Sequence, residues 1–159
     1  MLIIYDSRDG MTKKVADVVA EGARRASKVT VELKTADSVT AQDVIAADGC
    51  AFGSPSHFGI MSGKILTALT DIYPVRDNMA GKPAAVFTTG SGDQAAALEN
   101  IERIVGVFNP EFVRPGIAIE TVPGRALPWE VDKAHAADLG ERLAKAVMKE
   151  KPYTTKDLF

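Results

Sequence analysis

The amino-acid sequence predicts an α/β fold, a three-layer doubly wound domain in which helices cover both faces of a five-stranded parallel sheet. Short apolar segments alternate with segments whose apolar residues recur at helical spacing. Such alternation implies right-handed crossover connections between parallel strands. The chain has 159 residues, 46% of them hydrophobic, so we expect a single domain over residues 1–159 with a substantial core.

The first three elements are a strand, a helix and a strand. Residues 2–5, with the sequence LIIY, predict a short buried strand. Apolar and small residues within 15–23 then recur at the spacing of a helix face. Residues 28–33 predict the second strand, because β-branched residues occupy positions 29–31.

The next elements begin with a helix-capping motif. Residues 40–43, TAQD, resemble a capping box with Asp in place of Glu, and predict a short helix that ends near residue 47. Residues 50–53 predict the third strand. Apolar residues at helical spacing within 65–73 then predict a helix, and Pro74 directly after them is expected to end it.

The last four elements complete the alternation. Residues 84–89 predict the fourth strand, and the apolar face within 98–108 predicts the helix after it. Residues 117–119 predict the fifth strand. A final helix has its apolar face within 139–147 and is expected to end before Pro152.

Three turns lie where doubly wound sheets bind ligands, beyond the carboxyl ends of the strands at the topological switch point. They comprise residues 7–12, 54–59 and 89–93, which follow the first, third and fourth predicted strands. Each is rich in Gly, Ser or Thr, and two lead directly into a helix N-terminus, which favours an anion. One such turn needs no ligand to explain it, but three at one sheet edge predict a binding site.

The sequence departs from the patterns of three other classes of α/β protein. Residues 90–95, GSGDQA, fit a dinucleotide-binding pattern but follow the fourth strand, with no ribose-binding acid on a strand after them. Residues 59–64, GIMSGK, have three residues between the glycines of a phosphate-binding loop instead of four, and Ile65 replaces the magnesium-binding hydroxyl. A phosphoacceptor receiver domain needs Asp at the end of the third strand, where residues 53–54 are Gly-Ser. These classes are therefore disfavoured.

The three turns together resemble the flavodoxin-like superfamily, and within it the tryptophan-repressor-binding-protein type of NAD(P)H:quinone oxidoreductase. Residues 52–71, FGSPSHFGIMSGKILTALTD, are similar to the second flavin loop of that family. Residues 7–23 resemble its phosphate loop, and residues 87–98 its third loop. The resemblance covers most of residues 1–108 and implies the strand order 2-1-3-4-5. The Gly- and Tyr-containing segment that completes the site of the full-length quinone reductases is missing.

The resemblance implies FMN as cofactor, with NAD(P)H as co-substrate. Residues 7–12 would surround the 5′-phosphate at the first helix N-terminus. Residues 56–59 would follow one edge of the isoalloxazine ring, and residues 89–93 the other. His57 is the candidate catalytic residue, with an exposed turn residue as the alternative. The implied cofactor-binding residues are Ser7, Arg8, Asp9, Gly10, Met11, Thr12, Ser54, Pro55, Ser56, His57, Phe58, Gly59, Thr89, Gly90, Ser91, Gly92 and Asp93.

Two of the three turns contain a carboxylate, Asp9 in the first and Asp93 in the third. Asp9 departs from the family pattern, because a carboxylate cannot donate a hydrogen bond to phosphate as a hydroxyl does. We expect its side chain to turn outward and FMN to be held more weakly as a result. Asp93 either opposes the negative charge of reduced flavin or caps the fourth helix.

The function implied by the resemblance is an NAD(P)H:quinone oxidoreductase that transfers a hydride through flavin N5 and then two electrons to a quinone. A one-electron carrier of the flavodoxin type stays open as the alternative, as does a binding module that has lost FMN. The net charge of −2 and the lack of Tyr or Trp in residues 54–61 favour the enzyme.

Composition and the remaining residues suggest the setting of the protein. The near-neutral charge gives no reason to expect nucleic acid as a partner. The lone Cys50, together with the lack of a signal peptide or a long apolar run, predicts a soluble cytoplasmic protein with a buried thiol and no membrane contact. We expect no metal site, and a structural role for His135. We also expect a homodimer or homotetramer in which residues 125–129 cover the flavin, with Trp129 either in that cover or in ordinary packing.

Overall fold

The computed structural model of the protein describes residues 1–26, 28–122 and 129–149. The strands in these residues are β1 (Leu2–Tyr5), β2 (Glu32–Thr35), β3 (Cys50–His57), β4 (Ile60–Met61), β5 (Pro83–Gly90), β6 (Glu111–Phe112) and β7 (Ile117–Glu120). The α-helices are α1 (Met11–Arg25), α2 (Ala41–Ala46), α3 (Gly63–Ile72), α4 (Gln94–Val105) and α5 (Trp129–Lys149). Single 3-10 segments, Tyr73–Asn78 and Gly106–Phe108, extend α3 and α4.

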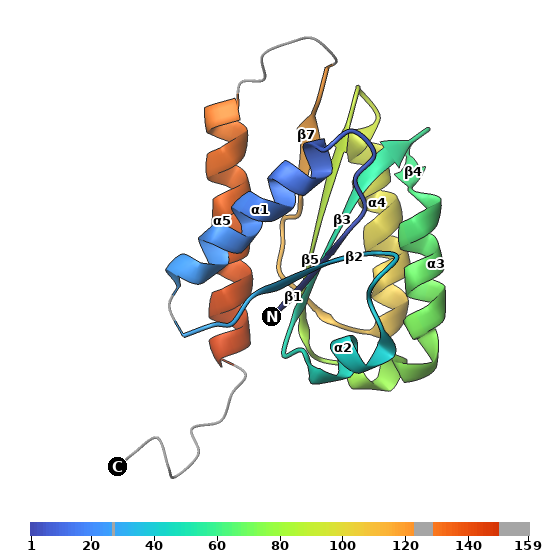
Figure 1. Cartoon of the computed structure of the whole chain (residues 1–159), viewed down its shortest axis with the longest axis vertical. Helices are drawn as coiled ribbons and strands as arrows, with labels where there is room; N and C mark the ends of the chain where they lie inside the picture. The colour runs from blue at the N-terminus through green and yellow to red at the C-terminus, as the bar shows by residue number, and fades with distance from the viewer. Residues whose placement is uncertain (27, 123–128, 150–159) are drawn as a thin grey trace.

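The sheet is parallel, in the order β2-β1-β3-β5, and its last position is shared by β6 and β7, which both pair with β5 (Figure 1). Short β4 is the exception, since it runs antiparallel to the end of β3. Counting only the main strands in chain order, this is the order 2-1-3-4-5. The prediction of a doubly wound α/β sheet is confirmed.

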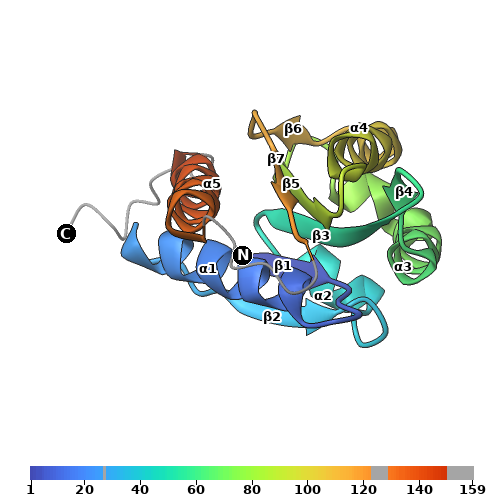
Figure 2. The same cartoon turned by 90° about the horizontal axis from the view of Figure 1, so that it is seen from above.

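Helices cover both faces of the sheet, α1 and α5 on one side and α2, α3 and α4 on the other (Figure 2). The strand residues alternate between the two layers because successive side chains point to opposite faces. Ile3 and its register partner Ala51 lie in the core under α1 and α5, whereas Ile4 and its partner Phe52 lie in the core under α2, α3 and α4. The sheet thus has an apolar core on each face.

Three strands differ from their predicted bounds. The second strand was placed at residues 28–33 but lies at Glu32–Thr35, with Glu32 opposite Leu2. The third strand continues past the predicted residues 50–53 to His57. The fifth position holds two short strands, of which only Ile117–Glu120 was predicted. The predicted helices are confirmed, although α5 begins at Trp129, ten residues before the predicted apolar face at 139–147, and Pro152 lies outside the described residues.

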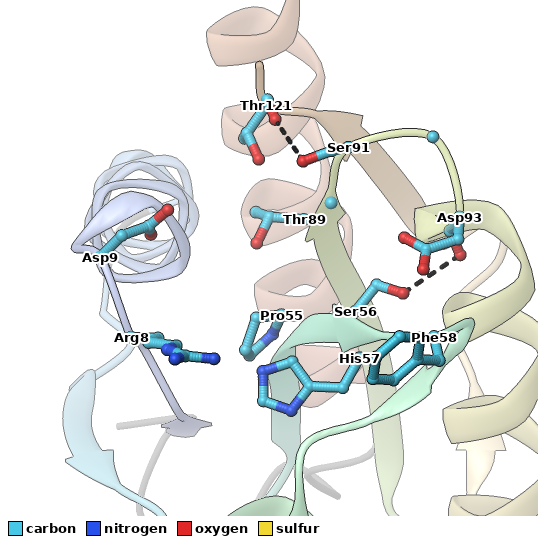
Figure 3. Close-up of a pocket in the computed structure, with 12 residues that line it drawn as sticks. Arg8, Asp9, Pro55, Ser56, His57, Phe58, Thr89, Ser91, Asp93 and Thr121 are labelled. Atoms are coloured by element: carbon cyan, nitrogen blue, oxygen red, sulfur yellow. Dashed lines mark hydrogen bonds between the residues drawn. The ribbon is translucent and has the colours of Figure 1, made fainter. Parts of the chain in front are cut away.

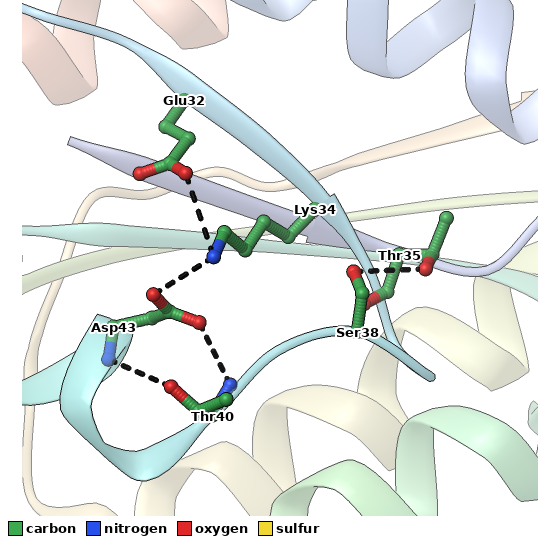
Figure 4. A network of polar contacts seen from close by, with 6 residues as sticks. All are labelled: Glu32, Lys34, Thr35, Ser38, Thr40 and Asp43. Atoms are coloured by element: carbon green, nitrogen blue, oxygen red, sulfur yellow. Dashed lines mark hydrogen bonds and ion pairs between the residues drawn. The ribbon is translucent and has the colours of Figure 1, made fainter.

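The short helix α2 has the predicted capping box (Figure 4). The Asp43 N–H donates to Thr40 Oγ1 at 3.2 Å, and the Thr40 N–H donates to Asp43 Oδ2 at 2.8 Å. The other carboxylate oxygen of Asp43 accepts from Lys34 Nζ at 2.9 Å. The hydrogen bond from Lys34, followed by that from the Thr40 N–H, lowers the pKa of Asp43 below its usual range. A local sequence motif and a cross-element ion pair therefore fix this helix to β2.

The buried position of Cys50 is confirmed. It lies on β3 in the core, and burial raises the pKa of its thiol to about 12. None of the helices in the described residues is long and apolar enough to span a membrane.

Candidate functional site

The three predicted turns meet at one edge of the sheet, at the carboxyl ends of β1, β3 and β5, although residues 54–57 and 89–90 belong to the strands themselves. Strand register explains this, since Tyr5 lies opposite Gly53 and Pro55 lies opposite Thr89. The turns surround a cleft of about 620 Å³ (Figure 3). Its lining residues are Arg8, Asp9, Pro55, Ser56, His57, Phe58, Thr89, Gly90, Ser91, Gly92, Asp93 and Thr121.

Thr121 lines this cleft and was missed by the sequence prediction. It directly follows β7, and its N–H donates to the Gly90 carbonyl oxygen at 2.7 Å. Its own carbonyl oxygen accepts from the Ser91 hydroxyl at 3.1 Å. The rule that selected the other turns, a position beyond the carboxyl end of a parallel strand, also applies to Thr121.

The middle turn joins β3 to β4 through Phe58 and Gly59. Both residues have positive φ, 56° and 78°, as a two-residue type I′ hairpin requires. Phe58 adopts this conformation without being glycine, and its side chain is 100% exposed at the cleft. The Gly59 N–H donates to Asp93 Oδ2 at 2.9 Å and to Ser56 Oγ at 3.1 Å. The strained turn is thus held by oxygen atoms from its own loop and from the loop after β5.

Asp93 does not cap α4 with its side chain, although it stands at the N-cap position. Its carboxylate instead accepts from Gly59, and its carbonyl oxygen accepts from the Ser56 hydroxyl at 3.3 Å. A Cβ at Gly90 would come within 2.9 Å of Ser56 Cβ, so the two loops approach closely there. The capping alternative was therefore wrong, because the carboxylate is used to join the second and third loops.

The first turn is held by its own side chains. The Gly10 and Lys13 N–H groups donate to Ser7 Oγ at 3.1 and 3.2 Å. The Met11 N–H donates to Asp9 Oδ1 at 3.0 Å. Asp9 is exposed, but the prediction that its side chain turns outward was wrong, because its carboxylate folds back onto the N-terminus of α1 and the residue lines the cleft.

Six predicted residues do not line this cleft, namely Ser7, Gly10, Met11, Thr12, Ser54 and Gly59, and of these Ser7 lines a second cleft. The Thr12 hydroxyl is buried and pairs with the Thr89 hydroxyl at 2.9 Å. Ser54 is also buried, and its Oγ accepts from the Ser62 N–H at 2.9 Å. These two buried side chains therefore join the loops to one another and to the start of α3.

A second cleft, of about 670 Å³, adjoins the first. Arg8 and His57 line both clefts, so they form the boundary between them. Its lining residues are Asp6, Ser7, Arg8, Asp37, His57, Ser62, Gly63, Lys64 and Thr67. Lys64 pairs with Asp37 at 2.8 Å, and the hydrogen bond to Asp37 raises the pKa of Lys64.

The remaining predicted residues lie away from these clefts. His135 is exposed on α5 and lines a third cleft with Asp138 and Arg142, so a role in the core is excluded. Trp129 packs against the core under α1 and α5, in accord with the packing alternative. The proposed cover at 125–128 lies outside the described residues. Within residues 1–26, 28–122 and 129–149, no three His, Cys, Asp or Glu side chains gather as a metal site.

This chain is similar to one known family and to several known proteins. The family model described as a flavodoxin domain matches residues 2–104. A flavodoxin of Aquifex aeolicus is 42% identical over 93 residues, which cover 58% of this chain and 50% of that protein. A flavodoxin of Clostridium saccharobutylicum is 27% identical over 56% of this chain and 54% of its own length. The matched part of this chain thus spans about half the length of these two relatives.

A third relative matches nearly the whole chain. It is named NAD(P)H dehydrogenase (quinone), from Archaeoglobus fulgidus, and is 26% identical over 94% of this chain and 97% of its own length. Among solved structures, an archaeal flavodoxin superposes with a TM-score of 0.81 at 20% identity, covering 92% of this chain and 97% of that one. A WrbA-like flavodoxin from Agrobacterium tumefaciens gives a TM-score of 0.77 at 23% identity, covering 94% and 98%. At these identities the structures show the shared fold alone.

Proposed function

Because the chain belongs to the flavodoxin domain family, we propose that its first cleft binds FMN and that the loaded protein is an NAD(P)H:quinone oxidoreductase. The single observation that carries the proposal is the meeting of three loops around one cleft at the carboxyl edge of the sheet. Bound FMN would supply the hydride and electron-transfer chemistry, while the protein binds and orients the reactants.

The residues of the cleft fit a planar, polar ring with a phosphate tail. Residues 55–58 and 89–93 form two walls that supply hydroxyl groups and backbone amides. The close approach at Gly90 keeps these walls fixed relative to each other. The N-terminus of α1 lies at the end of the site where residues 7–12 would hold the phosphate. Asp9 is the one carboxylate among residues 7–12, and it opposes an anion there.

An enzyme role is supported by the arrangement of the two clefts. They share Arg8 and His57, so a second reactant has room next to the proposed flavin position. In the overall reaction, NAD(P)H, a quinone and one proton give NAD(P)⁺ and the hydroquinone. We assign His57 as the residue that donates a proton to a quinone oxygen. The relative matched over nearly its whole length carries the corresponding name.

A one-electron carrier is the second candidate, favoured by the flavodoxin that is 42% identical to this chain. Such a carrier would exchange electrons with a protein partner and would not need room for NAD(P)H or a quinone. The near-neutral charge of −2 gives it little electrostatic attraction for a basic partner.

The two candidates are separated by a flavin titration followed by steady-state kinetics. We expect FMN to bind, and NAD(P)H oxidation by a benzoquinone to give the parallel double-reciprocal lines of a ping-pong mechanism. Oxidation no faster than with free FMN, together with transfer to a one-electron acceptor, would instead identify a carrier. Failure to bind FMN would leave a binding module that has lost its flavin.

The two histidines provide a matched pair of variants for the role of His57. Replacing His57 with Ala should lower kcat with the quinone by about 100-fold, the usual contribution of a general acid. His135→Ala removes the same side chain from the distant third cleft and should leave kcat unchanged. An equal kcat in both variants would show that His57 takes no part in the reaction, and would leave the proposed flavin site untouched.

We also propose that the loaded protein self-associates, with the neighbouring chain helping to exclude water from the ring. Trp129 packs against its own core, which leaves the flavin to be covered by other groups. Sedimentation at several concentrations, with activity measured on the same samples, tests this. A monomer that keeps full activity at high dilution would exclude a shared site.

A further inference from the structure

The N-terminus of α1 already has oxygen acceptors from its own chain. Backbone N–H groups in the first turn of a helix have no partner within the helix, which is why helix N-termini bind phosphate. Here Ser7 Oγ accepts from Gly10 and Lys13, and Asp9 Oδ1 accepts from Met11. An anion at this turn would have to share or replace these contacts.

The two acceptors differ in charge. The Ser7 hydroxyl is neutral and has a proton of its own to donate, whereas the Asp9 carboxylate only accepts and repels an anion. The nearby Lys13 pairs with Asp17 at 2.9 Å, so its charge is already partly balanced. Arg8 turns toward the boundary of the two clefts, near His57 (Figure 3).

We infer that Asp9 is a specificity-determining residue that makes the site nearly indifferent to the flavin phosphate, so that riboflavin and FMN bind with similar affinity. The inference rests on the proposed function, because it concerns the phosphate end of the same flavin site. The phosphate of FMN carries close to two negative charges at neutral pH. It must displace a carboxylate from the Met11 N–H and then remain beside it, whereas riboflavin, which lacks the phosphate, meets neither cost.

The experiment compares FMN and riboflavin by fluorescence titration of the full chain. Asp9→Asn removes the charge but retains an oxygen that can accept from Met11, so the turn should keep its conformation. Asp9→Thr places a hydroxyl there as a second variant. Asp71→Asn makes the same change of net charge at an exposed position on α3 and serves as the control.

For the wild type and for Asp71→Asn we expect the two flavins to differ in affinity by less than about tenfold. In Asp9→Asn and Asp9→Thr, FMN should bind about tenfold more tightly, with riboflavin affinity changed less than about twofold. An unchanged FMN-to-riboflavin ratio in both variants would overturn the inference while leaving the flavin site intact. If neither flavin bound any of the four proteins, the proposed function would fall as well.

Discussion

The Thr12 hydroxyl, on the first turn of α1, and the Thr89 hydroxyl, at the end of β5, form a buried hydrogen bond of 2.9 Å. It joins the first loop of the site to the third across 77 residues of sequence. A buried hydroxyl that loses its hydrogen-bond partner lowers the stability of the fold. Thr12→Val and Thr89→Val should therefore each lower the free energy of unfolding by about 1–3 kcal/mol, measured by urea denaturation.

The double variant distinguishes this pair from two independent contacts. Because Thr12→Val together with Thr89→Val leaves no unpaired hydroxyl, it should be less destabilised than the sum of the single changes. If the decrease in the free energy of unfolding in the double variant equalled the sum of the two single decreases, the two hydroxyls would not act as a pair in solution.

Asp93 holds the strained middle turn through the Gly59 N–H. Asp93→Ala should speed hydrogen exchange of the Gly59 amide by up to about tenfold, because one net hydrogen bond is lost while that to Ser56 remains. FMN affinity should fall as well. Asp93→Asn keeps a side-chain oxygen and should restore most of the protection. Unchanged exchange in Asp93→Ala would show that Ser56 alone holds the turn.

Local signals in the sequence predicted the elements, and contacts between distant residues defined the site. The capping box at 40–43 was predicted because its two partners lie three residues apart. The second strand was misplaced because β2 is an edge strand of ELKT, whose position is set by pairing with β1 and by the ion pair from Lys34. β-branched residues at 29–31 carry no information on that register.

The role of Asp93 shows the same limit at the site. Its place before α4 suggested a cap, since N-cap preference is a local property. Its actual partner, Gly59, lies 34 residues earlier in the sequence and reaches it only through the pairing of β3 with β5. The loops were thus predictable as a set, but the hydrogen bonds that join them were not.

The link between α2 and β2 should depend on pH through Asp43 (Figure 4). Because folding lowers the pKa of Asp43, its contribution is complete above the pKa of the unfolded chain, near 3.8. It is lost as the pH falls through the lower pKa of the folded state. We therefore measure the free energy of unfolding of the wild type and of Asp43→Asn by denaturation between pH 7 and pH 2. The difference between the two should decrease below about pH 4.

Thr40→Ala separates the cap from the ion pair in this element. It removes the acceptor for the Asp43 N–H and should cost about 1 kcal/mol of stability near neutral pH. If the difference in the free energy of unfolding between the wild type and Asp43→Asn stayed constant down to pH 2, the charge of Asp43 would not be coupled to folding.

Helices α1 and α5 cross where each presents a glycine to the backbone of the other. A Cβ on Gly22 would lie 1.9 Å from the Ala137 carbonyl oxygen, and a Cβ on Gly140 would lie 1.9 Å from that of Val19. Alanine is favoured over glycine inside a helix by about 1 kcal/mol, so helix propensity alone predicts that these substitutions stabilise the protein. The helix contact predicts that they destabilise the protein, because the atoms in the way are backbone carbonyl oxygens. These atoms can move away only if the two helices separate.

We therefore expect Gly22→Ala and Gly140→Ala each to lower the free energy of unfolding by about 1–3 kcal/mol, or roughly 2–10 °C in Tm. Gly63→Ala provides the matched control, since a Cβ there meets no atom within 4 Å at the start of α3. That variant should be neutral or more stable by up to about 1 kcal/mol. If Gly22→Ala gained stability as Gly63→Ala does, helix propensity would outweigh packing, and α1 and α5 could not cross as closely as the structure shows.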